Sequence, residues 1–182
     1  MDSPDGFAHV LYGHVEDLLG SVGARIGNVD CFAAASGPGS FTRVRVGLAA
    51  IKGFGEATGK PAVAIPTLEA VAIHGEGALR AAVLDAHRGE VYGAVYDDGL
   101  RLVSPPMVGP LEPWLASLPK GVIEFVTVRA SWLAPLLAST SFGSAVIRET
   151  GPALAPGVAR LAAQRFRSCH PVDPAAGPLA RR

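Results

Sequence analysis

The spacing of hydrophobic positions changes several times along the first third of the chain. Between residues 7 and 22, apolar residues recur every three or four positions, which predicts an amphipathic helix. Residues 29–35 (VDCFAAA) form a short, almost wholly apolar run, which is typical of a strand buried on both faces. A second helix is predicted from a glycine-rich turn to about residue 57, with Ser40 as its N-cap, and residues 61–65 predict another buried strand.

The remaining two thirds of the chain read as a strand meander followed by alternating elements. Thr67 is expected to cap a helix that runs to about residue 74. The segment 104–113 contains four prolines, so we expect a loop there. The other predicted elements are strands at 79–85, 90–96, 100–103, 123–127 and 145–148, and helices at 111–118, 131–138 and 156–167. This order predicts an α/β fold with a mixed sheet.

Composition narrows the class of protein. The chain has 182 residues, of which 49% are hydrophobic and 18% charged, so it can bury a core and is not disordered as a whole. No apolar run reaches the roughly 18 residues of a membrane helix, and the acidic start Met1-Asp2-Ser3-Pro4-Asp5 is unlike a signal peptide. We therefore expect a cytoplasmic protein without a membrane partner. With only Cys31 and Cys169, neither a structural zinc site nor a disulfide framework is expected.

Charge is balanced in sum but not in distribution. The chain carries 16 basic and 16 acidic side chains, which excludes a broad basic footprint for nucleic acid. Residues 1–30 hold five acids and one arginine, whereas residues 148–182 hold six arginines and two acids. Two interpretations remain open: ordinary solvated faces, or a basic tail that helps a partner to hold RNA.

A glycine-rich turn is the strongest candidate for a ligand-binding site in the sequence. The run SGPGSFT lies between a predicted strand and a predicted helix, where unpaired backbone N–H groups and the helix dipole favour an anion. One interpretation is a phosphate or nucleotide loop, with two arginines following at positions 43 and 45; the other is a tight connection only. The run lacks the ending of a P-loop and the full dinucleotide fingerprint. The loop candidates are Gly37, Gly39, Ser40 and Thr42.

A second polar cluster lies at the turn between the first two strands of the meander. Asp85, His87, Arg88 and Glu90 could act as acid and base or ligate a metal. Each is also an ordinary polar turn residue, and no second cluster of histidines or carboxylates stands at ligand spacing. We therefore assign no catalytic residue and no metal ligand.

Two stretches of the chain resemble one bacterial family. The run SGPGSFTRVRVGLAAIKGFGEATGKPAVAIPTLEAVA, followed by VLDAHRGEVYGAVYD, resembles the TsaB (YeaZ) family, and the tail VDPAAGPLARR matches it in position. The resemblance implies the actin-like/sugar-kinase/Hsp70 superfamily, built from two ribonuclease-H-like lobes. These lobes would be residues 1–77, which bind a partner, and 78–182, whose last helix returns toward the first lobe.

The resemblance also implies a function. Family members act in making N6-threonylcarbamoyladenosine at position 37 of tRNAs that read codons beginning with A. They are implied to be non-catalytic and without a cofactor, pairing with the larger paralogue TsaD, which binds metal and transfers the threonylcarbamoyl group. A small ATPase, TsaE, docks on that pair, and tRNA is contacted through the complex. The present chain has no paired-His metal motif, which agrees with a non-catalytic role.

In that family the first two helices form the interface with TsaD or with a second copy. In the first helix, Leu11, Val15, Leu18 and Val22 form one stripe, from which Ala8, Tyr12 and Leu19 are rotated away. One stripe is expected to face the lobe and the other a partner; alternatively, all of these side chains pack within one fold. The partner-binding candidates are Ala8, Leu11, Tyr12, Val15, Leu19, Val44, Leu48 and Ile51.

The sequence also departs from the family. Arg43 replaces the glycine that usually follows GPGSFT, and Leu179-Ala180-Arg181 replaces a closing Tyr-Leu-Arg. The β-meander that opens family members is absent, which lowers the expectation of ATP binding. Either the start codon is assigned too late, which we favour, or a true truncation leaves an exposed sheet edge. The alternative function is a sugar-kinase-like phosphotransferase or ATPase that uses the GPGS loop; a peptidase lacks a metal motif or nucleophile.

Overall fold

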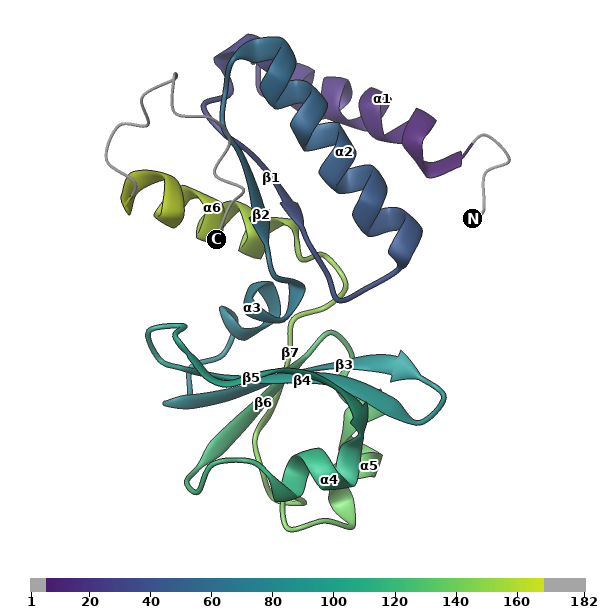
Figure 1. Ribbon diagram of the computed structural model, residues 1–182, viewed down its shortest axis with the longest axis vertical. Helices are drawn as coiled ribbons and strands as arrows, with labels where there is room; N and C mark the ends of the chain where they lie inside the picture. Colours follow the sequence, from purple (N-terminus) through teal and green to yellow (C-terminus); the bar gives the residue numbers. More distant parts are fainter. Residues whose placement is uncertain (1–5, 169–182) are drawn as a thin grey trace. The chain divides into compact units, whose positions relative to one another are not determined.

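The chain divides into two compact units. The computed structural model describes residues 6–168, with side chains from residue 10 (Figure 1). The first unit contains the chain up to Ser36, then Ser40–Ile65, and the chain from Ala159; the second contains Gly37–Gly39 and Pro66–Val158. Compared with the expected lobes 1–77 and 78–182, residues 66–77 belong to the second unit, and the chain from Ala159 belongs to the first.

In the first unit, two short parallel strands are joined by a long helix. The elements are α1 (Gly6–Ser21), the 3-10 helix η1 (Ile26–Asn28), β1 (Phe32–Ala35), α2 (Phe41–Thr58) and β2 (Ala62–Ile65). β1 and β2 pair in parallel from Phe32 opposite Ala62 to Ala35 opposite Ile65. The ring of Phe32 stacks on Phe54 of α2, with centroids 5.4 Å apart, and this contact fixes α2 on the strands.

The second unit contains a five-stranded mixed sheet, as the sequence predicts. Its strands are β3 (Leu79–His87), β4 (Glu90–Asp97), β5 (Leu102–Pro110), β6 (Ile123–Thr127) and β7 (Ile147–Glu149). The order is β5-β4-β3-β6-β7. β4 is antiparallel to both β3 and β5, whereas β6 is parallel to β3 and β7.

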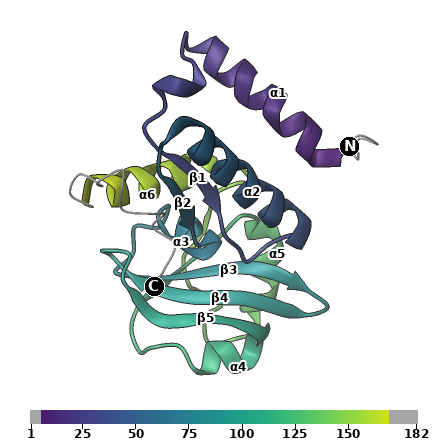
Figure 2. The same ribbon diagram turned by 45° about the horizontal axis from the view of Figure 1, so that its top comes forward.

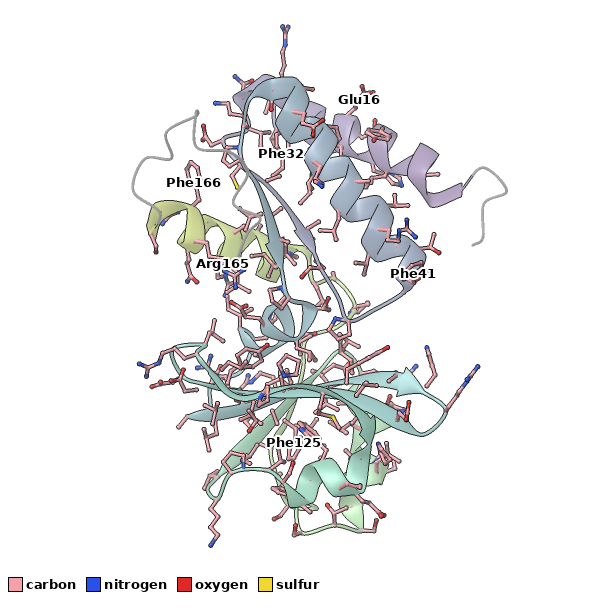
Figure 3. All side chains as sticks on the ribbon, viewed as in Figure 1. Glu16, Phe32, Phe41, Phe125, Arg165 and Phe166 are labelled. Atoms are coloured by element: carbon pink, nitrogen blue, oxygen red, sulfur yellow. The ribbon has the colours of Figure 1, made fainter. Side chains whose placement is uncertain are left out.

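Short helices and apolar layers cover both faces of this sheet. One layer contains Trp114 and Leu115 of α4 (Leu111–Ala116) with Leu133 and Leu137 of α5 (Ala130–Ala138), and Phe125 lies at its centre (Figure 3). The other layer contains Leu68 and Val71 of α3 (Thr67–Ala72). The alternation of side chains along β6 places Phe125 and Val126 on opposite faces of the sheet, so both faces are buried.

Two local predictions are wrong, and that of Ser40 as an N-cap is confirmed only in position. The proline-rich segment predicted as a loop forms most of β5, because Pro105 and Pro106 lie in an edge strand, where a missing N–H is tolerated. Ser40 occupies the N-cap of α2, but its side chain makes no capping hydrogen bond. Pro66, rather than Thr67, is the N-cap of α3, and Thr67 is a buried first-turn residue.

The last helix, α6 (Ala155–Ser168), has a buried and an exposed side. Leu161 and Ala162 are buried, whereas Arg160 and Arg167 are exposed. Within the first unit, Nη1 of Arg165 donates a hydrogen bond of 3.2 Å to the carbonyl oxygen of Ala64 in β2 (Figure 3 labels Arg165). Over residues 6–168, none of the helices combines the length and the apolar character needed to cross a membrane.

Candidate partner-binding surface

α1 turns one row of apolar side chains toward the rest of the first unit. Leu11, Val15 and Leu19 are half-buried and follow one another at intervals of four residues. The ring of Tyr12 meets Phe54 of α2 edge to face, with centroids 5.5 Å apart. These contacts hold α1 against α2 while much of its surface stays in solvent (Figure 2).

A second apolar row of α1 remains exposed. Leu18, in the last turn of α1, and Val22, the residue that follows the helix, are 67% and 70% exposed, and Tyr12 is 51% exposed. The expected stripe through Leu11, Val15, Leu18 and Val22 is therefore wrong. At about 100° per residue, Leu18 lies well to one side of the row that continues from Val15 to Leu19.

The partner-binding candidates occupy different environments in the structure. Val44 and Leu48 of α2 are half-buried, but Ile51 is only 9% exposed and belongs to the core of the unit. The side chain of Ala8 lies outside the described residues. Leu18 and Val22, which were not among the candidates, are the most exposed apolar side chains that the structure describes on or next to α1.

A cavity of about 390 Å³ lies between α1, η1 and α2. Its apolar lining includes Val15 and Leu19 from α1, Ile26 from η1 and Phe54 from α2. Glu16 also lines it and is labelled on α1 in Figure 3. This volume lies in the range of small-molecule pockets and could equally take an apolar side chain of a partner.

The candidate anion loop is divided between the two units. Gly37 and Gly39 belong to the second unit, where the carbonyl oxygen of Gly37 accepts a hydrogen bond of 2.7 Å from the N–H of Thr67. Ser40 and Thr42 belong to the first unit, at the start of α2.

The first turn of α2 is positively charged. It contains no acidic residue, and the guanidinium of Arg45 lies over the exposed ring of Phe41, 5.0 Å from its centroid (Figure 3 labels Phe41). Arg43 is exposed in the same turn. This end of the helix favours a negative charge through its dipole, but no side chain supplies one from the N-cap.

The polar turn between β3 and β4 forms a small hydrogen-bonded cluster. Oδ1 of Asp85 accepts a hydrogen bond of 2.7 Å from the N–H of His87. Oδ2 lies 3.7 Å from both Nδ1 of His87 and Nη2 of Arg129, whereas Arg88 and Glu90 are exposed. Among residues 6–168, no three His, Cys, Asp or Glu side chains gather as metal ligands do. The contacts are those of a stabilised hairpin turn.

Glu124 is a buried acid that the sequence analysis missed. Its Oε2 accepts hydrogen bonds of 2.6 Å from the N–H groups of Glu76 and Gly77, and its Oε1 accepts one of 2.6 Å from Nε of Arg148. Burial acts to raise the pKa of Glu124, but the bonds from Gly77, Arg148 and Glu76 outweigh it and hold the pKa below its ordinary value. The available signal was one carboxylate inside the otherwise uncharged strand IEFVT.

The architecture defines the class of protein first. An α/β chain with this fold, consisting of the two-stranded unit and the five-stranded mixed sheet, belongs to the actin-like, ribonuclease-H-like superfamily. Residues 6–106, more than half of the chain, match the family described as "TsaD: tRNA N6-adenosine threonylcarbamoyltransferase". The chain belongs to this family.

Curated relatives are similar over part of their length. An uncharacterized protein of Mycobacterium leprae is 34% identical over 110 residues, which cover 59% of this chain and 30% of that protein. An uncharacterized protein of Mycobacterium tuberculosis is 35% identical over 103 residues, covering 56% of this chain and 48% of that protein. The "tRNA threonylcarbamoyladenosine biosynthesis protein TsaB" of Escherichia coli is 36% identical over 86 residues, covering 45% and 37%. The chain thus spans less than half of the length of these relatives.

Solved structures match over most of the chain. The structure titled "YeaZ from Pseudomonas aeruginosa" superposes with a TM-score of 0.69 and 24% identity, covering 88% of this chain and 78% of that one, and supports the fold. A protein described as uncharacterized "with similarity to peptidase YEAZ from Pseudomonas aeruginosa" gives a TM-score of 0.71 and 27% identity, covering 98% and 86%. The resemblance to the TsaB (YeaZ) family is confirmed.

Proposed function

We propose that the chain is a non-catalytic subunit that binds a TsaD-type paralogue through α1 and the adjoining face of α2. The paralogue would transfer the threonylcarbamoyl group to adenosine 37 of tRNAs that read codons beginning with A. In this proposal the present chain supplies a docking surface, the TsaE ATPase binds the pair, and tRNA is contacted through the complex. A homodimer would use the same helices when the paralogue is absent.

The exposed apolar row of α1 is the observation that carries this proposal. Leu18 and Val22 together expose adjacent apolar side chains to solvent. Contiguous apolar surface on a helix of a soluble protein often marks a site where another protein binds. Tyr12 lies on the same helix and lines the adjoining cavity. An apolar side chain of a partner helix fits this cavity, in the way that helix-in-groove complexes place their anchors.

The charges around this row indicate what the partner contributes. The only charged residues of α1 are Glu16 and Asp17, both exposed and both acidic. Basic side chains of a partner helix, placed at the edge of the interface, would complement these two acids. Such charges mainly raise the association rate and the specificity of binding.

Co-purification with the TsaD paralogue of the same organism tests the proposal. The double variant Leu18→Glu/Val22→Glu places two charges in the apolar row and should weaken binding at least about tenfold, about 1.4 kcal/mol or more. Dissociation constants from titration calorimetry of the full chain measure this effect. Circular dichroism should stay unchanged, because both side chains are exposed.

Val122→Glu is the matched control. Val122 is 90% exposed and lies in the second unit, so this variant should bind the paralogue as the unmodified chain does. Failure of the unmodified chain to co-purify would refute the proposal. Tight ATP binding by the isolated chain, measured by titration, would instead favour the phosphotransferase alternative.

A further inference from the structure

The exposed side of α6 carries arginines and no acid. The helix contains three arginines and neither Asp nor Glu. Leu161 and Ala162 are buried, so the opposite side of the helix faces solvent. On that side, Arg160, Gln164 and Arg167 are exposed and follow one another at intervals of four and three residues. Residues at these intervals lie on one face of a helix, and we call these three the arginine row.

The two arginines of this row are not used by the fold. Among the residues whose side chains the structure describes, neither Arg160 nor Arg167 forms an ion pair. Arg165 differs, because it donates to the carbonyl oxygen of Ala64 and holds α6 on β2. The helix dipole stabilises Arg167 in the last turn, but Arg160 lies in the first half of the helix, where the dipole does not favour a cation.

The composition of the arginine row favours a polyanion over a protein as its ligand. Protein interfaces centre on large buried side chains, yet over residues 155–168, all of which the structure describes, no large apolar side chain is among the exposed ones. Arginine presents a planar fork of N–H donors that binds a phosphate through two hydrogen bonds. Arg160 and Arg167 lie about 10 Å apart along the helix axis, so they can bind two different phosphates of one strand.

We propose that the arginine row binds the phosphate backbone of the tRNA on which the proposed pair acts. The identity of this RNA rests on the proposed function, whereas the preference for a phosphate backbone rests on the charge and exposure of α6. Contacts of this kind position a nucleic acid without reading its sequence, and they weaken as salt is added. The balanced charge of the whole chain excludes a broad basic footprint but not one narrow row.

The placement of α6 allows the paralogue and the RNA to bind together. Within the first unit, α6 lies on the other side of β1 and β2 from α1 and α2 (Figures 1 and 2). The two sides also differ in charge, since Glu16 and Asp17 are the only charged residues of α1. These acids repel a polyanion from the docking surface, and the arginines attract it to α6.

A salt series of tRNA affinity tests the arginine row. Arg160→Gln/Arg167→Gln removes two charges from α6 and keeps Arg165. In the complex of the full chain with the TsaD-type paralogue, this variant should raise the dissociation constant for a tRNA transcript at least about tenfold, measured by fluorescence anisotropy. The slope of log K against log salt should fall in magnitude by about 2. Arg88→Gln/Lys120→Gln is the matched control: it removes the same charge from exposed positions of the second unit and should change neither quantity.

Co-purification and the isolated chain separate this inference from the proposed function. Both double variants leave α1 and α2 unchanged, so they should pair with the paralogue as the unmodified chain does. If the unmodified chain does not pair, the proposed function fails, and the same salt series with the isolated chain still tests the row. Weak binding of the transcript should then be lost in Arg160→Gln/Arg167→Gln and retained in the control. Circular dichroism establishes that each variant folds.

Photocross-linking identifies the class of ligand on α6. In a chain with Cys31→Ser and Cys169→Ser, a benzophenone attached to Gln164→Cys lies in the middle of the arginine row and should cross-link the tRNA. The same group attached to Lys120→Cys, at an exposed position of the second unit, should not.

Three results would overturn the proposal. The first is an Arg160→Gln/Arg167→Gln variant that binds tRNA as its control does, or a chain that binds none, alone or in the pair. The second is cross-linking from Gln164→Cys to the paralogue instead of the tRNA, which would place a protein on α6. The third is equal cross-linking of tRNA from Gln164→Cys and Lys120→Cys, which would indicate random collision.

Discussion

Glu124 connects three segments of the second unit through one carboxylate. It is the second residue of β6. Its Oε2 accepts hydrogen bonds from the backbone before β3, and its Oε1 accepts one from Arg148 of β7, whose Nη2 also lies 2.9 Å from Oε2 of Glu76. Hydrogen bonds to a buried charge are stronger than neutral ones, and leaving their partners unsatisfied is costly. The arrangement therefore stabilises the sheet although it takes no part in the proposed docking.

The first residue-scale prediction concerns pH. The folded-state pKa of Glu124 is lowered, so its contribution to stability is present above the unfolded pKa of about 4.3 and is lost as pH falls through the folded value. Glu124→Gln should lower the free energy of unfolding by about 2 kcal/mol at pH 7. The loss should shrink as the pH falls below the unfolded pKa and through the lowered folded pKa, because the native carboxyl becomes protonated over that range.

Denaturant unfolding at several pH values measures this difference. Glu112→Gln serves as the control, because Glu112 is exposed in the first turn of α4 and makes none of these contacts. A deficit for Glu124→Gln that is the same at pH 3 and pH 7 would contradict the linkage.

The second residue-scale prediction concerns Gly93 of β4. A Cβ added there would lie 2.5 Å from the indole of Trp114, which is buried in the core under α4. Gly93→Ala should therefore destabilise the chain by about 2 kcal/mol, since the ring must move. Gly53→Ala is the contrasting variant: no atom lies within 4 Å of its Cβ, and alanine should stabilise α2 by about 0.5 kcal/mol. The melting temperature should fall for Gly93→Ala and rise for Gly53→Ala.

At the scale of elements, the start of α2 is electrostatically unfavourable. Arg43 and Arg45 lie where the helix dipole disfavours positive charge, and Ser40 provides no side-chain cap. Arg43→Glu should raise the stability by about 0.5 kcal/mol at low salt, and the gain should fall as salt is added. Lys52→Glu, an exposed mid-helix change, should give no such gain. An equal effect of both variants on the melting temperature would exclude the dipole as the cause.

The elements also show why sequence patterns succeeded in some places and failed in others. The run IEFVT predicted β6 at its observed bounds, because a segment of five residues that contains the β-branched residues Ile123, Val126 and Thr127 and an aromatic residue is too short for most helices and favours a strand. The prolines of β5 misled the prediction, since sequence does not reveal that a strand will lie at a sheet edge. On α1, periodicity identified the helix, but whether Leu18 or Leu19 faces inward depends on α2.

At the scale of the whole molecule, the fold class could be predicted from the order of elements and from the resemblance. Which apolar side chains are exposed on the surface could not be predicted from the sequence. The sequence indicated two amphipathic helices, yet Ile51 proved to be buried and Leu18 exposed. Tertiary packing decides which apolar side chains of a helix remain exposed to solvent. Glu124 illustrates the same point: its partners come from residues 48, 47 and 24 positions away. No local pattern encodes such distances.

The hydrogen bond from Arg165 to Ala64 has a consequence for the order in which the chain can fold during synthesis. Its two residues lie 101 positions apart, and residues 66–158 between them belong to the second unit. All strands of the second unit are therefore made before α6 can contact β2. Because compact units fold as they emerge, the second unit can form its sheet first, and the first unit is complete only when α6 follows.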